Sequence, residues 1–269
     1  MKTVRGKAAL VTGAASGIGR AIALALAREG ADLYLVDIDE AGLNATACEA
    51  QRFGATLATH RCDLAQPAEI TAMVNALLSA WGKLDILVNN AGIAYYGPTG
   101  AMTAEQWSRL LAVNLLAPIQ LVRELLPTLQ ARGDAHILNV SSIFGLVPLR
   151  KAAAYQASKY GLVGLSAALR AEYAREIGVT VLCPGFVRTG MLETFETGSA
   201  GQRRHIIPDW VCASPEAVGA AAVRAIRRNK GLVLITPMAR LVWWLARLSP
   251  SLVDWLTRQG WRRRQGDEN

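Results

Sequence analysis

Seven short, almost wholly apolar segments recur along the chain, and longer stretches of helical character separate them. Strands that are apolar throughout, rather than alternating with polar residues, are typical of a sheet covered by helices on both faces. Because strands and helices alternate, the strands should run mainly parallel, with right-handed crossovers. The pattern predicts an α/β fold with a single doubly wound parallel sheet of about seven strands. The expected strands are KAALVTG, ADLYLVD, ATLATHRC, LDILVNNAG, AHILNVSS, VTVLCPG and GLVLIT.

No linker or shift in composition interrupts this pattern before about residue 238. We expect one domain over residues 1–237 and a C-terminal helical appendage over residues 238–269. The four cysteines form no CxxC pair and the three histidines lie far apart, so neither a disulfide framework nor a metal site is predicted. The chain opens without a signal-peptide pattern, from which we expect a cytoplasmic protein.

The net charge of +8 belongs to the C-terminal part of the chain. Residues 221–269 hold ten Lys or Arg against three Asp or Glu, whereas the remainder holds nineteen against eighteen. A basic tail on a nearly neutral domain gives no reason to expect nucleic-acid binding.

A glycine-rich turn, VTGAASGIGR, follows the first expected strand and opens the first helix. Gly13, Gly17 and Gly19 would allow a tight turn, a close approach to a pyrophosphate and close packing of helix on strand. The amino end of the helix would then face the anion with its N–H groups and its positive dipole. Taken alone, the turn is also compatible with an ordinary strand–helix connection.

Asp37, at the end of the second expected strand, supports the dinucleotide interpretation and indicates which cofactor binds. A carboxylate there can accept both ribose hydroxyls of the adenosine and would repel a 2′-phosphate. The positions where a basic residue could receive that phosphate hold Ser16 and Ile38. NAD is therefore favoured over NADP, and the alternative is that Asp37 merely caps the strand.

The stretch YQASK places Tyr155 one helical turn before Lys159, so both side chains would point into the same cleft. The ordinary phenol pKa is about 10, and bringing it near 7 requires roughly 4 kcal/mol. One ammonium ~5 Å away contributes roughly 3 kcal/mol at an effective dielectric constant of about 20. We therefore expect Lys159 to lower the pKa of Tyr155, which could otherwise be a packing aromatic.

With TGAASGIG, NNAG, NVSS, YQASK and PG in this order, the chain resembles a short-chain dehydrogenase/reductase of the compact branch over about residues 5 to 236. The resemblance implies a Rossmann fold, an NAD(P)-dependent oxidoreductase activity and a homodimer or homotetramer built on the helices 104–131 and 154–177. It also implies a catalytic tetrad of Asn114, Ser142, Tyr155 and Lys159. The family's usual serine-to-tyrosine separation selects Ser142 over Ser141.

The resemblance extends to the cofactor. It implies that Asp63 contacts the adenine, that Asn90 borders the cofactor, and that Thr189, with Val187 beside it, holds the nicotinamide carboxamide. The full set of expected cofactor-binding residues is Gly13, Ser16, Gly17, Ile18, Gly19, Asp37, Asp63, Leu64, Asn90, Ala91, Gly92, Tyr155, Lys159, Pro184, Gly185, Val187 and Thr189.

The segment 238–264 departs from the compact pattern and contains four of the chain's seven tryptophans, Trp243, Trp244, Trp255 and Trp261. Arg240, Arg247 and Asp254 recur every seven residues and would mark one polar stripe on an apolar helix, which Ser249-Pro250 should break in two. A transmembrane span is not expected. Three interpretations stay open: packing on the same or a sister subunit, an interfacial helix on an anionic membrane, or part of the substrate mouth.

A loop over residues 190–211 is the expected substrate lid, and its apolar residues are Met191, Leu192, Phe195 and Trp210. They favour a hydrophobic substrate. We therefore expect an NAD-dependent oxidoreductase that interconverts a secondary alcohol and a ketone of steroid-, retinoid- or lipid-like character. The alternatives are an NADP-dependent 3-oxoacyl-thioester reductase and a dinucleotide-binding protein without turnover. The substrate, the physiological direction and the number of subunits are not predicted.

Overall fold

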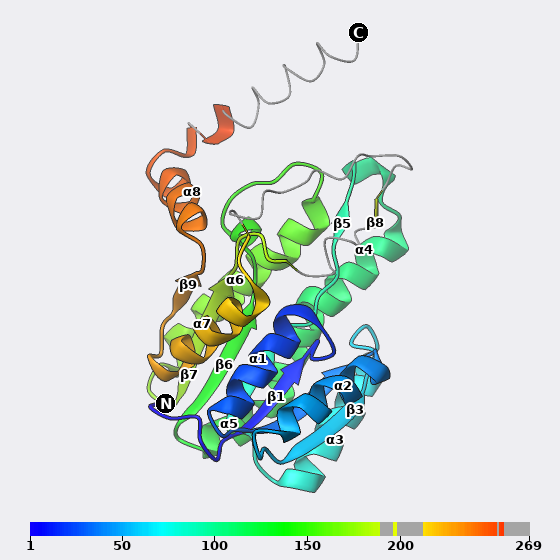
Figure 1. Ribbon diagram of the computed structural model, residues 1–269. Coiled ribbons are helices and arrows are strands. Elements are labelled where there is room, and N and C mark those ends of the chain that lie inside the picture. Colours follow the sequence, from blue (N-terminus) through cyan, green and yellow to red (C-terminus); the bar gives the residue numbers. More distant parts are fainter. Residues whose placement is uncertain (189–195, 198–211, 252, 256–269) are drawn as a thin grey trace.

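A seven-stranded parallel sheet forms the centre of the protein in the computed structural model, which describes residues 1–188, 196–197, 212–251 and 253–255 (Figure 1). The strands are β1 (Ala8–Thr12), β2 (Asp32–Asp37), β3 (Leu57–Arg61), β4 (Ile86–Asn89), β6 (Ala135–Val140), β7 (Ile177–Cys183) and β9 (Leu232–Leu234). They are ordered β3-β2-β1-β4-β6-β7-β9, and every neighbouring pair is parallel. All seven expected strands are present, and the doubly wound α/β fold is confirmed.

Helices cover both faces of this sheet. They are α1 (Gly17–Arg28), α2 (Glu40–Gln51), α3 (Pro67–Trp81), α4 (Ala104–Leu111), α5 (Ala117–Ala131), α6 (Ala153–Tyr173), α7 (Pro215–Arg227) and α8 (Pro237–Leu248). Several begin as their sequences require. Thr103 caps α4 in a capping box with Gln106, and proline occupies the first turn of α3, α7 and α8.

The strands are mostly apolar because successive side chains enter two separate cores. On β1, Val11 joins an apolar cluster that includes Ile22 of α1 and Val223 of α7. Its neighbour Leu10 joins the cluster on the opposite face, which includes Leu125 of α5. Figure 1 shows α1 and α7 side by side on one face of the sheet.

The helical run Ala104–Ala131 was expected as one regular helix, but a π-helical turn, Ala112–Leu116, separates α4 from α5. This run is long and apolar enough to cross a membrane by length and composition. Its buried residues, such as Leu121 and Leu125, nevertheless belong to the core cluster beneath the sheet. They therefore pack as those of an ordinary core helix do.

A second, two-stranded sheet was not predicted from the sequence. Tyr95–Tyr96 (β5) and Glu196–Thr197 (β8) form a small parallel pair, too short to leave a recognisable pattern.

In the C-terminal appendage, α8 ends at Leu248 and the next helical segment begins at Pro250, which confirms the expected break at Ser249.

His136 is a buried titratable group near the start of β6. Its Nε2 lies 2.9 Å from the Thr180 hydroxyl oxygen, and that hydroxyl donates to the Lys230 carbonyl. The hydroxyl oxygen therefore accepts from a His136 Nε2–H, and among the described residues Nδ1 has no hydrogen-bond partner. Burial, together with the positive N-terminus and Arg170, lowers the pKa of His136 to about 3.

We predict that His136 makes the fold acid-sensitive. Between pH 3 and pH 6.5 the unfolded chain binds a proton that native His136 does not, so the free energy of unfolding falls as the pH falls through this window. From pH 7 to pH 4 the wild type should lose about 3 kcal/mol more than His136→Gln, as measured by urea denaturation. The matched control His60→Gln, at a half-buried histidine on β3, should lose as much as the wild type; equal losses in wild type and His136→Gln would contradict the assignment.

Candidate active site

Several predicted site residues follow the carboxyl ends of the central strands, which lie at one edge of the sheet (Figure 1). Gly13 follows β1, Asn90 follows β4, Ser142 follows β6 and Pro184 follows β7. This edge, near the point where the strand order reverses between β1 and β4, is where open α/β sheets bind their ligands.

The glycine-rich turn requires glycine for two separate reasons. Gly13 has φ +67° and Gly17 has φ +53°, a region that other L-residues rarely adopt. A Cβ on Gly13 would also lie 2.7 Å from Asn90 Nδ2, and one on Gly19 would clash with the Gly13 carbonyl. The turn therefore packs directly against the segment after β4, and the amino end of α1 lies at the edge of the sheet.

Thr12 and Asn90 hold this turn to its neighbour. Asn90 Nδ2 donates to the Thr12 carbonyl at 3.0 Å, and the Thr12 hydroxyl oxygen accepts from the backbone N–H groups of Asn90 and Ala91. The same hydroxyl donates to the Val88 carbonyl at 3.2 Å. Thr12 was not among the predicted site residues; the signal was its place as the last residue of a strand that opens the glycine-rich turn.

Asp37 is held by backbone groups at the end of β2. Its Oδ2 accepts from the Ala15 N–H at 3.0 Å, and its Oδ1 accepts from the Asp39 N–H at 3.1 Å. The carboxylate is thus tied to the glycine-rich turn itself. The next residue, Ile38, is 47% exposed and presents an apolar side chain where a basic residue would be needed to bind a 2′-phosphate.

Four further residues were expected to contact the cofactor: Asp63, Leu64, Val187 and Thr189. Asp63 accepts from the Ala65 N–H at 2.9 Å and lies 3.5 Å from Arg109 Nη1. Leu64 and Val187 are buried in the apolar clusters, so any ligand contact there would come from their backbones. Thr189 lies outside the described residues, as does most of the expected lid.

Tyr155, Lys159 and Ser142 come together as the sequence predicted. Lys159 Nζ lies 5.6 Å from the centroid of the Tyr155 ring and donates to the Val140 carbonyl at 3.0 Å. Ser142 hydrogen-bonds Tyr155 and accepts from the Phe144 N–H, which places its side chain at the start of the turn after β6. Ser141 instead donates to the Lys159 carbonyl, so it supports α6 from beneath.

Burial governs the protonation of this group. It lowers the pKa of Lys159 to about 8 and raises the pKa of Tyr155 above its ordinary value, which the hydrogen bond from Ser142 only partly opposes. Burial also raises the pKa of the neighbouring Cys183 thiol to about 12. The expectation that Lys159 brings the phenol pKa down is therefore wrong for the protein by itself, because desolvation of the phenol is the larger effect.

The side chain of Asn114, a member of the expected tetrad, is held by hydrogen bonds to two other segments. The fully buried side chain accepts from the Ile93 N–H and donates to the Ile93 carbonyl, each at 2.8 Å. It also donates to Ser158 Oγ at 3.2 Å, and Ser158 donates to the Tyr155 carbonyl. The π-helical turn thus uses a side chain to join the segment after NNAG to the helix that carries Tyr155.

Gln156, the second residue of YQASK, was overlooked because nothing in its type marks it. Its Nε2 donates to the Val147 carbonyl at 2.9 Å and to the Phe144 carbonyl at 3.4 Å. These bonds tie the turn that follows Ser142 to α6. A single side chain therefore helps to set the position of Ser142 relative to Tyr155.

The residues present fit a nicotinamide dinucleotide. The glycine-rich turn brings the amino end of α1 to the sheet edge, where a pyrophosphate would bind. Lys159 is 4% exposed, and its ammonium, which has three N–H donors, donates to the Val140 carbonyl. A Cβ on Gly92 would lie 3.4 Å from Lys159 Nζ, so a bulkier residue would crowd this cation.

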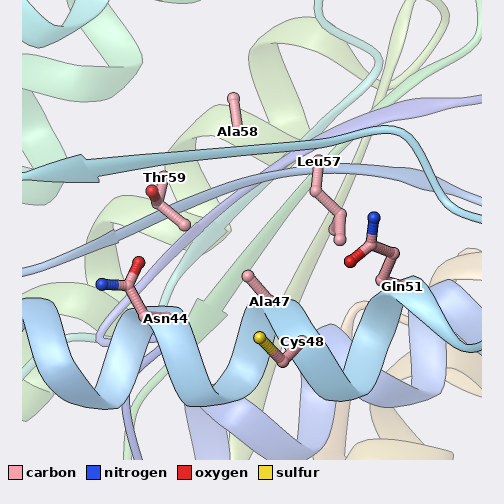
Figure 2. Close-up of a pocket in the computed structure, with 7 residues that line it drawn as sticks. All are labelled: Asn44, Ala47, Cys48, Gln51, Leu57, Ala58 and Thr59. Atoms are coloured by element: carbon pink, nitrogen blue, oxygen red, sulfur yellow. The ribbon is translucent and has the colours of Figure 1, made fainter.

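The hollow in Figure 2 is a different place on the molecule. It lies between α2 and β3, and none of its lining residues is a predicted site residue. Those residues are Asn44, Ala47, Cys48, Gln51, Leu57, Ala58 and Thr59.

Comparison with known proteins gives consistent matches. A family model described as short chain dehydrogenase matches residues 7–200. The Mycobacterium tuberculosis protein named as the oxidoreductase SadH is 33% identical over 268 residues, which cover 97% of each chain. D-threitol dehydrogenase of Mycolicibacterium smegmatis is 37% identical over 223 residues, 81% of this chain and 85% of the relative. Ketoacyl reductase 1 of the granaticin polyketide synthase of Streptomyces violaceoruber is 41% identical over 196 residues, 72% of each chain.

Solved structures of short-chain dehydrogenases also match most of this chain. A short-chain dehydrogenase/reductase from Burkholderia phymatum in complex with NAD has a TM-score of 0.83 at 29% identity, covering 94% of this chain and 96% of its own. A short-chain dehydrogenase from Sphingobium yanoikuyae in complex with NADPH has a TM-score of 0.78 at 28% identity, covering 98% and 96%.

We predict that Asn114→Leu destabilises the fold, because it leaves the N–H and carbonyl of Ile93 without their partner. The expected loss is about 2–4 kcal/mol in the free energy of unfolding, measured by urea denaturation. Asn44→Leu, at an exposed asparagine of α2, is the control and should change stability by less than about 0.5 kcal/mol. Similar losses in the two variants would show that the Asn114 bonds do not carry the effect.

Proposed function

The chain belongs to the short-chain dehydrogenase family, and from this premise we propose that it is an NAD-dependent oxidoreductase that interconverts a secondary alcohol and a ketone. The observation that carries the proposal is that Tyr155 hydrogen-bonds Ser142 and has the Lys159 ammonium 5.6 Å from the centroid of its ring. A phenol so placed can move a proton to or from a substrate oxygen.

Each of the three side chains has its own part in this reaction. Tyr155 takes the proton of the alcohol in oxidation and returns it to the oxygen in reduction. Ser142 hydrogen-bonds the substrate oxygen and stabilises the negative charge that develops there. Lys159, whose pKa of about 8 keeps it mainly protonated at pH 7, supplies positive charge beside the ring and donors for ribose hydroxyls.

Because the pKa of Tyr155 is raised, the site needs a further positive charge near the phenol. Lys159 alone does not overcome the desolvation of the phenol, so additional positive charge is needed to release its proton near neutral pH. A nicotinamide dinucleotide, when bound, supplies the hydride exchange and, in its oxidised form, a positive charge. The residues that would hold it are the glycine-rich turn, Asp37, Asp63, Asn90 and Lys159.

NAD is proposed over NADP because of the residues after β2. The Asp37 carboxylate is tied to the glycine-rich turn, and Asp39 adds a second carboxylate that caps α2 through the Gly42 N–H. Two negative charges and the apolar Ile38 are a poor environment for a 2′-phosphate. The solved relatives include an NAD complex and an NADPH complex, so the choice depends on the residues of the individual chain.

A hydrophobic substrate is proposed from the surroundings of Ser142. Ile143 and Val147, in the turn after this serine, belong to an apolar cluster, and Phe144 packs edge-on against Phe186 with ring centroids 5.7 Å apart. The named relatives act on a sugar alcohol or are ketoacyl reductases, so the family accommodates both polar and polyketide-like groups. A panel of secondary alcohols graded by chain length, run with NAD⁺ and NADP⁺, tests both parts of the proposal.

The second candidate is an NADP-dependent 3-oxoacyl-thioester reductase. The 41% identity to a ketoacyl reductase favours this substrate class, whereas the two carboxylates after β2 argue against its usual cofactor. A protein that binds a dinucleotide without turnover is disfavoured by the juxtaposition of Ser142, Tyr155 and Lys159. Tight NADH binding with no activity across the whole alcohol panel would reinstate it.

Tyr155→Phe should lower kcat by about 10²–10⁴-fold, because it removes the group that transfers the proton. Binding of NADH, measured by tryptophan fluorescence or calorimetry, should change little. Tyr160→Phe, at a tyrosine of α6 that is 45% exposed, is the control and should retain activity. Turnover by Tyr155→Phe at the level of this control would contradict the role assigned to the phenol.

The double variant Asp37→Ala/Ile38→Arg should shift the ratio of kcat/KM for NAD⁺ and NADP⁺ toward NADP⁺ by roughly 10²-fold, since it removes a like charge and adds an opposite one. Asp32→Ala, at the other end of β2 where the carboxylate accepts from the Thr56 N–H, should leave the ratio unchanged. An unchanged ratio in the double variant would exclude Asp37 as the determinant of cofactor choice.

A further inference from the structure

The helix α8 presents a second apolar face to solvent. At 100° per residue, five apolar residues fall within one stripe about 120° wide along its outer side. Leu241 is 60% exposed, Trp244 is 51% exposed and Leu248 is 75% exposed. We call this face the α8 stripe; it consists of Met238, Leu241, Trp244, Leu245 and Leu248.

The opposite face of the same helix already holds α8 to the domain. Ala239 is buried, and Val242, Trp243 and Ala246 pack against the cluster that contains Ile143, of the turn after Ser142. Thr236 caps the helix by accepting from the Ala239 N–H. The α8 stripe is therefore not needed to attach the helix, and Figure 1 shows α8 at the end of β9, on the outside of the fold.

Positive charge accompanies the α8 stripe. Arg240 and Arg247 are both exposed and lie along one border of it, with Arg247 also stacked over the Trp243 ring at 5.6 Å. The chain around the helix is the most basic part of the sequence, with ten Lys or Arg against three acidic residues in 221–269. Four of those arginines follow Trp255 in the sequence.

We propose that α8 docks on an anionic lipid surface, with the α8 stripe at the boundary of the acyl chains and the flanking arginines on the headgroup phosphates. An exposed apolar face bordered by arginine and tryptophan is the composition of interfacial helices. A helix of twelve residues is too short to cross a bilayer, so it lies on the surface.

The charge distribution favours lipid over a second copy of the chain. A symmetric contact through the α8 stripe would bring two segments of the same strong positive charge together, whereas an anionic surface neutralises them. The proposal does not depend on the enzymatic activity. It does have a consequence for it, because α8 packs on the turn that follows Ser142 and would bring that side of the site close to the lipid.

The test is co-sedimentation of the full-length protein with vesicles of equal phosphatidylglycerol and phosphatidylcholine, and with vesicles of phosphatidylcholine alone. The wild type should bind the anionic vesicles, and binding should weaken as salt is raised. Leu241→Glu/Leu248→Glu should reduce the partition coefficient at least tenfold, and Arg247→Gln about fivefold. Phe53→Glu, at a residue 39% exposed just after α2, is the control and should bind as the wild type does.

Two further measurements decide between the possible occupants. Sedimentation velocity without lipid should give the same mass for wild type and the double glutamate variant, and turnover of a short soluble alcohol should be unchanged. No binding to anionic vesicles, or an equal loss in Phe53→Glu, would overturn the proposal. So would dissociation of an oligomer in the double variant, which would make the α8 stripe a contact between copies. The vesicle-binding experiment tests the proposal even if the protein turns over no alcohol.

Discussion

The burial of the Lys159 ammonium at the carboxyl end of β6 is the constraint around which the site is built. Removing this cation from water lowers its pKa to about 8, and within the described part of the chain the ammonium donates to the Val140 carbonyl. The neighbouring groups are arranged to accommodate the amine: Gly92 leaves room for it, and Ser141 ties the helix backbone at Lys159 to the end of β6. A buried cation contributes little to stability, and N–H donors beyond the one bonded to Val140 can serve a polar ligand.

Around the lysine, too, polar side chains form hydrogen bonds with the backbone of neighbouring segments. Asn114 lies in a π-helical turn and satisfies both backbone groups of Ile93, while Gln156 satisfies two carbonyls in the turn after Ser142. These segments are irregular because they form the edge of the cleft, and irregular backbone has polar groups that side chains must satisfy. The polar residues around Tyr155 thus position the loops at this edge of the sheet.

The parts of this molecule that the sequence predicts are those whose signal is local. Seven buried strands, the glycine-rich turn and the one-turn spacing of Tyr155 and Lys159 are each contained in a few consecutive residues. The π-helical turn, the bonds of Asn114 and the support given by Gln156 depend on segments far apart in the chain, and no local pattern marks them. The protonation of Tyr155 was misjudged for the same reason: the charge of Lys159 can be read from the spacing, whereas desolvation depends on everything packed around the phenol.

The two faces of α8 connect the site to the surface of the molecule. Trp243 and its neighbours share one apolar cluster with Ile143, which follows Ser142 directly, and with Cys183, at the end of β7. Anything that holds α8 in place therefore also stabilises the turn that follows Ser142. A helix held only by its inner face exposes several large apolar side chains at a cost in solubility, and this cost is offset if the outer face has a partner. The basic character of the surrounding segment indicates that such a partner carries negative charge, which a second copy of this segment does not.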